Sequence, residues 1–389
     1  MRILQVVGGM NRHGAETWLM NVLRSIDRTK FQIDFLVHTH EQQAYEDEAK
    51  ALGSQIIRCL HPSKPWLYAK NFRQVLCEYG PYDVVHSHLH HYSGFILQLA
   101  AQAGIPSRIA HNHSDTVQAE SKASLIRKAY CKLMRFWIAR YSTIGLSVSQ
   151  ASAPALFGPN WQKNPRWQVA HCGIDLAPFK VLVDPTIVRS ELGIAPDAFV
   201  IGHVGRFYEP KNHIFLIEVF AEIAKCDPNA CLLLVGEGPL RVLAEQRVAQ
   251  LGLTKQVVFT GLRADVQRLM LGAMNVYLFP SLYEGLALVL IEAQAAGLPC
   301  IVSDVIPEEA GIIPSLVHRL SLSQNPQEWA MTALAKKQVK AKANQLENLK
   351  SIESSSFNIR ESLKRLEEAY TKTASNRCDP SSESFNLST

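Results

Sequence analysis

Short apolar runs alternate with segments of helical periodicity along the first part of the chain. Four such runs are nearly uninterrupted and predict strands buried on both faces of a parallel sheet: residues 3–7, 32–37, 83–86 and 108–110. Between them, residues 15–25 and 93–103 space their apolar side chains as a helix does. This alternation predicts βαβ units and hence a doubly wound α/β domain.

The same pattern restarts after residues 175–198, where periodicity is weak and three prolines occur (Pro178, Pro185 and Pro196). We expect this segment to join two domains. Five further apolar runs then predict the strands of a second domain: residues 199–204, 231–235, 257–260, 276–279 and 300–302. The sequence therefore predicts two Rossmann-like halves.

The C-terminal segment has a different character. A helix is predicted near residues 357–372 from its apolar positions, Ile359, Leu363, Leu366 and Tyr370. Beyond Thr373 the chain is rich in Ser and Asn, and we expect residues 374–389 to be disordered.

Composition narrows the class of protein. A chain of 389 residues with 47% hydrophobic residues can bury two full cores, and its net charge of +5 is too weak to indicate nucleic-acid binding. Its eight cysteines form no CxxC pair, which is typical of reduced thiols in the cytoplasm. We expect no cleavable signal in the segment that begins Met1-Arg2, and no run of about 18 apolar residues predicts a membrane-spanning helix.

The segment of residues 279–299 carries the most chemical information. Glu284 follows a predicted strand, a helix is expected to begin near Gly285, and Glu292 comes eight positions after Glu284. A fully helical path would separate the two carboxylates by roughly 12 Å, farther than the paired carboxylates of hydrolases, so they suit two contacts on one elongated ligand. The alternative is a solvated helix terminus followed by an ordinary surface glutamate.

Two cations follow the first strand of the second half. Arg206 and Lys211 come directly after residues 199–204, so we expect them at the carboxyl edge of a sheet, where doubly wound folds bind ligands. A planar guanidinium and an ammonium together suit a diphosphate, although both residues could be ordinary surface cations.

A glycine pair, Gly8-Gly9, follows the first strand and suits a close approach of the backbone to a ligand. It lacks the G-x-G-x-x-G spacing of nicotinamide sites, and no acidic residue ends the second strand.

Taken together, these segments resemble the retaining family 4 glycosyltransferases, which have the GT-B fold, and within that family most resemble bacterial capsule and exopolysaccharide enzymes. The resemblance covers nearly the whole chain. It rests on the segment around Glu284 and Glu292 and on five further motifs: Gly8-Gly9 through Thr17, Gly173-Ile174-Asp175, Gly205-Arg206 through Asn212, Leu234 through Pro239, and Phe259 through Val266.

The resemblance implies two Rossmann-like domains facing across a cleft. Residues 1–180 would form the acceptor-side domain and residues 181–350 the nucleotide-sugar domain, while a helix within 351–373 would return to the first domain. The implied reaction moves a sugar from a nucleotide-sugar donor, expected to be UDP-linked, to a glycan or lipid-linked acceptor. A nucleotide-sugar epimerase of similar shape and a non-catalytic nucleotide-sugar-binding subunit are the alternatives.

The resemblance also implies residue roles. Arg206 and Lys211 would neutralise the leaving diphosphate, so that no metal or cofactor is required. Glu284 would bind a hydroxyl of the donor hexose, Glu292 the ribose, and His113 the transferred sugar, with His111 as the alternative for that last role. The remaining residues implied at the donor are Gly205, Gly236, Gly238, Arg263, Gly285, Leu286, Ala287 and Leu288, and those implied at the acceptor-side loop are Gly8, Gly9 and Gly14.

Two departures from the family pattern stand out. His13 occupies a position where relatives usually have glycine, and Ala287 one where many have proline or glycine.

Two other features allow alternatives. Six histidines lie at or just after predicted strand ends: His86, His88, His90, His91, His111 and His113. One interpretation of such a cluster is a metal site, but no nearby acidic or cysteine cluster in the sequence completes the ligand set. Residues 121–141 mix basic and apolar side chains, as does a helix that lies on an anionic membrane. The same pattern fits a core-facing helix with a solvated basic face.

Overall fold

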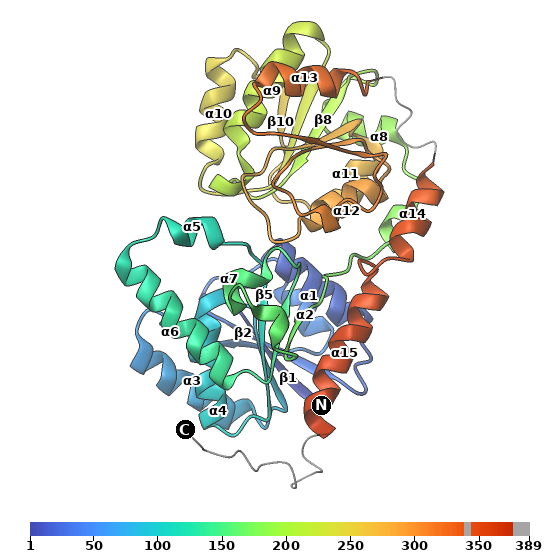
Figure 1. Ribbon diagram of the computed structural model, residues 1–389. Helices are drawn as coiled ribbons and strands as arrows, with labels where there is room; N and C mark the ends of the chain where they lie inside the picture. The colour runs from blue at the N-terminus through green and yellow to red at the C-terminus, as the bar shows by residue number, and fades with distance from the viewer. Residues whose placement is uncertain (338–343, 376–389) are drawn as a thin grey trace. The chain divides into compact units, whose positions relative to one another are not determined.

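The computed structural model describes residues 1–337 and 344–375. Its contacts divide the chain into two compact units (Figure 1). The first unit comprises Met1–Asn11, Ala15–Cys172 and the chain from Arg360 onwards, and the second comprises Arg12–Gly14 and Gly173–Ile359. Each unit is built on one sheet.

The sheet of the first unit has seven strands in the order β3-β2-β1-β4-β5-β6-β7, and every neighbouring pair is parallel. The strands are β1 (Arg2–Val7), β2 (Gln32–Val37), β3 (Ile56–Arg58), β4 (Val84–Ser87), β5 (Ser107–Asn112), β6 (Ile144–Ser147) and β7 (Trp167–Val169). The strand order reverses at β1, so the carboxyl ends of β1 and β4 flank a topological switch point, where such folds bind ligands.

Helices connect these strands, as parallel pairing requires. They are α1 (Gly14–Ser25), α2 (Glu46–Ala51), α3 (Pro65–Tyr79), α4 (Ser93–Gln102), α5 (Val117–Ser121), α6 (Leu125–Tyr141) and α7 (Ala153–Phe157), with 3₁₀ turns η1 (His90–Tyr92) and η2 (Trp161–Lys163). Helices α4 and α6 pack closely at Gly94, where a Cβ atom would lie 2.5 Å from the carbonyl oxygen of Met134. Only glycine fits this contact.

The second unit repeats the plan with six parallel strands in the order β10-β9-β8-β11-β12-β13. They are β8 (Val200–Val204), β9 (Cys231–Val235), β10 (Val257–Phe259), β11 (Val276–Phe279), β12 (Cys300–Ser303) and β13 (Val317–Leu320). Its helices are α8 (Pro185–Glu191), α9 (His213–Cys226), α10 (Arg241–Gln250), α11 (Val266–Gly272), α12 (Leu288–Ala295), α13 (Pro326–Leu334) and α14 (Gln345–Glu353), with η3 (Ala177–Lys180), η4 (Glu209–Lys211) and η5 (Glu308–Ala310). The switch point lies between β8 and β11.

All nine predicted strands are present, but four more were missed: β3, β6, β7 and β13. Each is three or four residues long, too short for a run or an alternation to stand out. The joining segment 175–198 also holds a helix, α8, that we did not predict. Pro185 is its first residue, and the Asp184 side chain accepts a hydrogen bond from the backbone N–H of Thr186, so here proline begins a helix.

The predicted C-terminal helix is α15 (Ile359–Ser375), and it packs on the first unit as expected (Figure 1). The indole Nε1–H of Trp18 in α1 donates to Ser362 Oγ at 3.1 Å, and the Gln5 amide in β1 donates to the Tyr370 hydroxyl at 2.8 Å. From residue 376 onwards, the predicted disordered tail lies outside the described residues.

Glycine is required where the chain leaves the first unit. A Cβ at Gly173 would lie 2.7 Å from the carbonyl oxygen of Asn358. The next residue, Ile174, pairs with Asn358 in an isolated parallel bridge.

Candidate donor site and histidine cluster

The carboxyl end of β8 delivers the two predicted cations. Arg206 is exposed, and its guanidinium lies 5.1 Å from the centre of the Tyr208 ring. Lys211 ends η4 and is followed by Asn212, which adopts the left-handed conformation (φ 53°) that asparagine tolerates better than most residues. Together these turns place both cations just beyond the end of a central strand.

The ammonium of Lys211 pairs with the carboxylate of Glu284. Its Nζ lies 2.5 Å from Glu284 Oε1, and the two side chains are only 20% and 13% exposed. The same Nζ lies 4.7 Å from the centre of the Phe279 ring. Because Glu284 follows β11 and Lys211 follows β8, the predicted cation and carboxylate meet at the switch point of one sheet.

Backbone contacts hold these two loops in place. The side-chain amide of Asn212 donates to the carbonyl of Pro280 at 3.2 Å, and the N–H of Leu282 donates to the carbonyl of Pro210 at 2.8 Å. The loop that carries Lys211 is therefore tied to the loop that carries Glu284 at Pro210, within η4, and at Asn212, directly after it.

The predicted glycines of this unit allow close packing around Arg206. A Cβ at Gly236 would lie 2.1 Å from the carbonyl oxygen of Gly205, and one at Gly238 would lie 2.5 Å from that of Phe207. A Cβ at Gly205 itself would lie 3.0 Å from His203 Nε2. Glycine is therefore needed here for the loops to pack, whatever these positions contribute to a ligand.

The expected start of the helix after Glu284 was wrong by three residues. Helix α12 begins at Leu288, because Ala287 adopts a left-handed conformation (φ 69°, ψ 59°) and breaks the helical path before it. Gly285, Leu286 and Ala287 therefore belong to the loop. Glu292 lies just over one turn into the helix, and the separation of roughly 12 Å calculated for a continuous helix does not apply.

Glu292 lies in a buried environment. The side-chain amide of Gln267 in α11 donates to Glu292 Oε1 at 3.3 Å. Burial raises the pKa of Glu292 to about 7, and this hydrogen bond only partly opposes the shift.

Arg263 forms a bidentate ion pair with Asp265 in its own loop. Its Nε and one terminal nitrogen each lie 2.7 Å from an oxygen of that carboxylate. Asp265 also pairs with Arg268 at 3.4 Å. The structure thus accounts for Arg263 by a local contact, and its predicted role at the donor stays a prediction.

The glycine loop after β1 has no such local requirement. Neither Gly8 nor Gly9 adopts a left-handed φ, and a Cβ at Gly8 would meet only Leu89 at 4.0 Å. A Cβ at Gly14 would meet nothing within 4 Å. The packing of the described residues would therefore tolerate alanine at Gly8 and Gly14, which leaves the approach of a ligand as the predicted reason for glycine.

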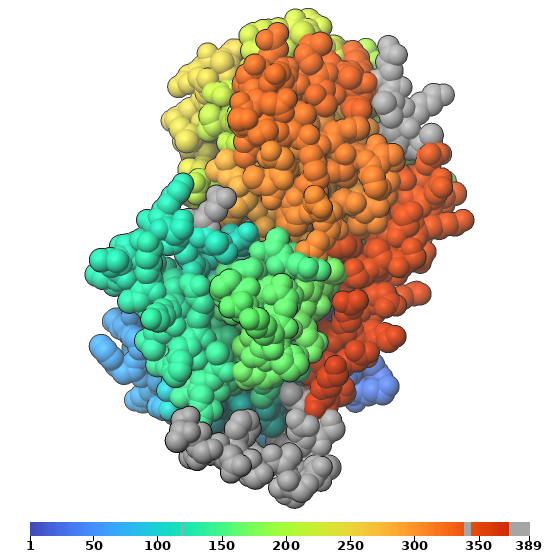
Figure 2. All heavy atoms as spheres, viewed as in Figure 1, coloured from blue at the N-terminus to red at the C-terminus, as the bar shows by residue number. Residues whose placement is uncertain are grey.

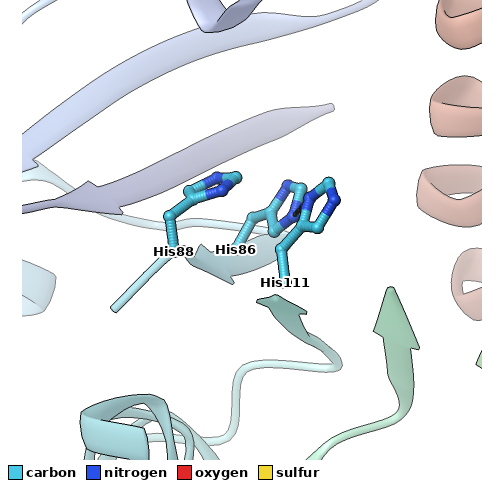
Figure 3. Close-up of side chains that lie close together, drawn as sticks. All are labelled: His86, His88 and His111. Atoms are coloured by element: carbon cyan, nitrogen blue, oxygen red, sulfur yellow. Dashed lines mark hydrogen bonds between the residues drawn. The ribbon is translucent and has the colours of Figure 1, made fainter. Parts of the chain in front are cut away.

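The histidines of the first unit gather at the ends of β4 and β5 (Figure 3). His86 Nε2 lies 3.1 Å from His111 Nδ1, and His88 Nδ1 lies 2.8 Å from His113 Nε2. Desolvation lowers the pKa of all four imidazoles, that of His113 to about 3, so they are neutral at pH 7.

Exposure separates the two candidates for the sugar-binding histidine. His111 is completely buried, whereas His113, which follows β5, is partly exposed. Only His113 is accessible from the surface of its unit, which favours the first of the two predicted assignments.

Three groups of described residues bring ligand-type atoms within 4.8 Å of one another: His86, His88 and His111; His111, His113 and Cys172; and His90, His91 and Glu120. In the first group, His86 Nδ1 lies 3.1 Å from the Tyr370 hydroxyl and His88 Nε2 lies 2.8 Å from Gln5 Oε1. These nitrogens therefore have hydrogen-bond partners within the protein.

Sequence reasoning missed Gln5, Gln267 and Tyr370 as partners of predicted site residues. For Gln5 a signal existed, since it is the one polar residue in the apolar run 3–7 and is completely buried. A buried polar side chain needs a partner, and a buried strand that contains one is worth examining. Gln267 carries no comparable signal, because α11 is short.

The chain matches two family models, one in each half. Residues 12–178 match Glycosyltransferase Family 4, and residues 198–335 match Glycosyl transferases group 1. The putative glycosyltransferase EpsF of Bacillus subtilis is 37% identical over 338 residues, which cover 85% of this chain and 86% of that protein. The capsular polysaccharide biosynthesis glycosyltransferase CapH of Staphylococcus aureus is 25% identical over 95% of this chain and 98% of its own length.

Solved structures share the fold. Anabaena HepE in complex with UDP and glucose superposes with a TM-score of 0.78 at 19% identity, covering 95% of this chain and 99% of that one. WaaG, a glycosyltransferase involved in lipopolysaccharide biosynthesis, gives a TM-score of 0.72 at 18% identity, covering 95% and 99%. The predicted GT-B fold class is confirmed, and the matches favour transferases over the epimerase alternative. The chain belongs to the family 4 glycosyltransferases.

Proposed function

We propose that the protein transfers a sugar from a UDP-linked donor, with retention of configuration, to a glycan or lipid-linked acceptor in capsule or exopolysaccharide biosynthesis. The observation that carries this proposal is the pairing of Lys211 with Glu284, beside Arg206, at the switch point of the second sheet. The HepE structure contains UDP and glucose, and a 28% identical Escherichia coli relative, matched over 58% of both chains, is named for UDP-Gal and a diphosphoundecaprenol acceptor.

Arg206 and Lys211 would neutralise the negative charge that builds up on the diphosphate as the glycosidic bond breaks. Glu284 would accept a hydrogen bond from a hydroxyl of the transferred sugar, and Glu292 would bind the ribose. His113 of the first unit would contact the transferred sugar, and the Gly8-Gly9 loop would lie on the acceptor side. We propose that these fixed charges replace a metal ion, so that the reaction needs no cofactor.

Incubation with UDP-glucose, UDP-galactose and UDP-N-acetylglucosamine tests the proposal through UDP release, with and without undecaprenyl-diphosphate-linked sugars. Transfer with release of UDP and an α-configured product supports it. Interconversion of donor sugars without an acceptor would identify an epimerase. Donor binding without hydrolysis or transfer would identify a non-catalytic subunit.

We further propose that helix α6 contacts an anionic membrane. One side of α6 is buried through Cys131, Met134 and Ile138. Yet Leu125 and Ile126 at its start are 84% and 85% exposed, and Phe136 is 63% exposed. This segment, teal in Figure 2, lies on the visible face of the molecule.

Basic side chains accompany the exposed apolar residues of α6, which is the combination that binds anionic lipid. They are Arg127, Lys128, Lys132, Arg135 and Arg140, with Lys122 just before the helix. No helix within the described residues has the length and hydrophobicity to cross a membrane. Co-sedimentation with phosphatidylglycerol vesicles tests the proposal: binding should weaken strongly in Leu125→Ser/Ile126→Ser. Equal binding of this variant would refute it.

A further inference from the structure

Seven buried or partly buried side chains of the first unit are linked in a chain of hydrogen bonds. It runs from Cys172 through His113, His88, Gln5, Tyr370 and His86 to His111. On the first side, Cys172 Sγ lies 3.9 Å from His113 Nδ1, His113 Nε2 lies 2.8 Å from His88 Nδ1, and His88 Nε2 lies 2.8 Å from Gln5 Oε1. On the other side, Gln5 Nε2 lies 2.8 Å from Tyr370 Oη, which lies 3.1 Å from His86 Nδ1. The last contact joins His86 Nε2 to His111 Nδ1 at 3.1 Å.

Elements that are far apart in sequence hold this chain of hydrogen bonds in place. Gln5 and His86 are register partners on the adjacent strands β1 and β4, and Tyr370 comes from α15. Figure 3 shows His86, His88 and His111 grouped at the strand ends. Tyr370 and Gln5 are completely buried, so water does not compete for their hydrogen bonds.

The proton positions along the chain follow from the capacity of each group. A neutral imidazole has one N–H donor and one lone-pair acceptor, and a phenol has one proton to donate. Burial raises the pKa of Tyr370, so its hydroxyl stays protonated. Because the Gln5 amide N–H donates to the Tyr370 oxygen, the Oε1 atom of the same amide faces His88.

The orientation of the Gln5 amide fixes the protons on His88 and His113. Gln5 Oε1 can only accept, so His88 Nε2 carries the proton, and His88 Nδ1 accepts from His113 Nε2–H. His113 Nδ1 is then a lone pair that faces the Cys172 thiol. His88 and His113 therefore hold their proton on Nε2.

We propose that Gln5 and Tyr370 are positioning residues that fix the tautomer of His113, so that a ligand can bind its ring only by donating a hydrogen bond to Nδ1. A sugar hydroxyl meets this requirement and a carboxylate does not. A sugar hydroxyl is therefore the group that we expect at His113 Nδ1. This last step rests on the proposed function, since it assumes that His113 faces the transferred sugar.

The tautomers are measured on the full-length protein labelled with ring-¹⁵N histidine. Long-range ¹H–¹⁵N correlation spectra distinguish Nε2–H from Nδ1–H, and His113→Asn assigns the His113 signals. We expect His113 in the Nε2–H form. The Nδ1–H form of His113 would overturn the proposal, and this measurement does not depend on enzymatic activity.

Variants on α15 test whether His113 is coupled to the distant phenol. Tyr370→Phe breaks the chain three links from His113, whereas Ser362→Ala removes a different buried hydrogen bond of the same helix. We expect only Tyr370→Phe to shift the His113 ring nitrogens and to lower kcat about tenfold with little change in KM, as for other groups that orient a functional imidazole.

Unchanged His113 shifts in Tyr370→Phe would refute the coupling. Equal effects of both variants on kcat would refute a positioning role and indicate one of general stability. If the protein showed no transferase activity at all, the proposed function would fail while the spectra still decided the tautomers.

Discussion

Lys211 Nζ lies 2.5 Å from Glu284 Oε1, although the two residues are 73 positions apart and follow different strands of one sheet. Such a partly buried pair is sensitive to the loss of either partner, because the remaining charge is left without compensation. The pair lies at the switch point of the second sheet, where doubly wound folds bind ligands.

Lys211→Ala and Arg206→Ala should each lower turnover by about 10²–10³, because each removes a charge that stabilises the leaving diphosphate. Lys225→Ala is the matched control, since Lys225 pairs with Glu222 at 2.6 Å on the surface of α9. Steady-state kinetics measure the turnover of the three variants. Turnover near that of the wild type in both site variants would contradict the assignment.

Adding Glu284→Gln to Lys211→Ala separates chemistry from folding. The double variant no longer leaves a partly buried carboxylate unpaired, so its thermal stability should exceed that of Lys211→Ala alone. Its turnover should remain at least as low. Recovery of both stability and turnover would show that the pair serves the fold only.

Substitution of Glu284 and of Glu292 should affect different kinetic parameters. Under the proposed roles, Glu292 binds ribose hydroxyls that do not change during the reaction, so Glu292→Gln should raise the donor KM more than it lowers kcat. Glu284 lies near the sugar where positive charge develops, so Glu284→Gln should act mainly on kcat. A Michaelis analysis of both variants tests this contrast, and the reverse outcome would exchange the two roles.

The buried Glu292 should make the protein more stable in mild acid. Its pKa is about 7 in the folded protein, against about 4.3 in an unfolded chain. Between these values the folded state keeps a proton that the unfolded state releases, so stability falls as the pH rises from about 4.5 to about 7, by about 3 kcal/mol at most. Urea unfolding at pH 5 and pH 8 should show this dependence reduced in Glu292→Gln and unchanged in the surface variant Glu222→Gln.

Ala287→Gly should stabilise the protein. Alanine in the left-handed region costs roughly 1 kcal/mol, which glycine avoids. Ala293→Gly, within α12, is the control and should destabilise by a similar amount or more, because that residue is helical and buried. Equilibrium unfolding of both variants gives the comparison, and a destabilised Ala287→Gly would show that its methyl group contributes packing that outweighs the strain.

Activity should survive EDTA if Arg206 and Lys211 supply the charge that a metal ion would bring. The assay compares the rate before and after chelation and dialysis. Complete loss of activity, restored by zinc or manganese, would instead assign an ion to one of the three groups of ligand-type side chains. It would support the alternative interpretation of the histidine cluster as a metal site.

The sequence predicted the long buried strands and the chemistry at their ends well, because an apolar run followed by charged or glycine residues is a local signal. Residues 199–204 and 276–279 identified the strands that carry Arg206 and Glu284. Edge strands such as β3 and β13 left no such signal, because they are short and only partly buried.

Backbone conformation and long-range pairing were harder to predict. The start of α12 depends on a left-handed alanine, which no propensity favours. The Lys211–Glu284 pair and the Gln5–Tyr370 contact join residues 73 and 365 positions apart. Such contacts depend on the order of strands in a sheet, which the local pattern does not contain.

The return of α15 to the first unit has a practical consequence for domain exchange. A fragment ending at Cys172 would lack the partners of Gln5, His86 and Trp18, and would expose the surface that the helix covers. A chimera that replaces residues 173–359 with the matching part of a relative keeps those partners. Exchange of the second unit between family members should therefore treat it as an insert flanked by two native segments, with both junctions beside the Ile174–Asn358 bridge.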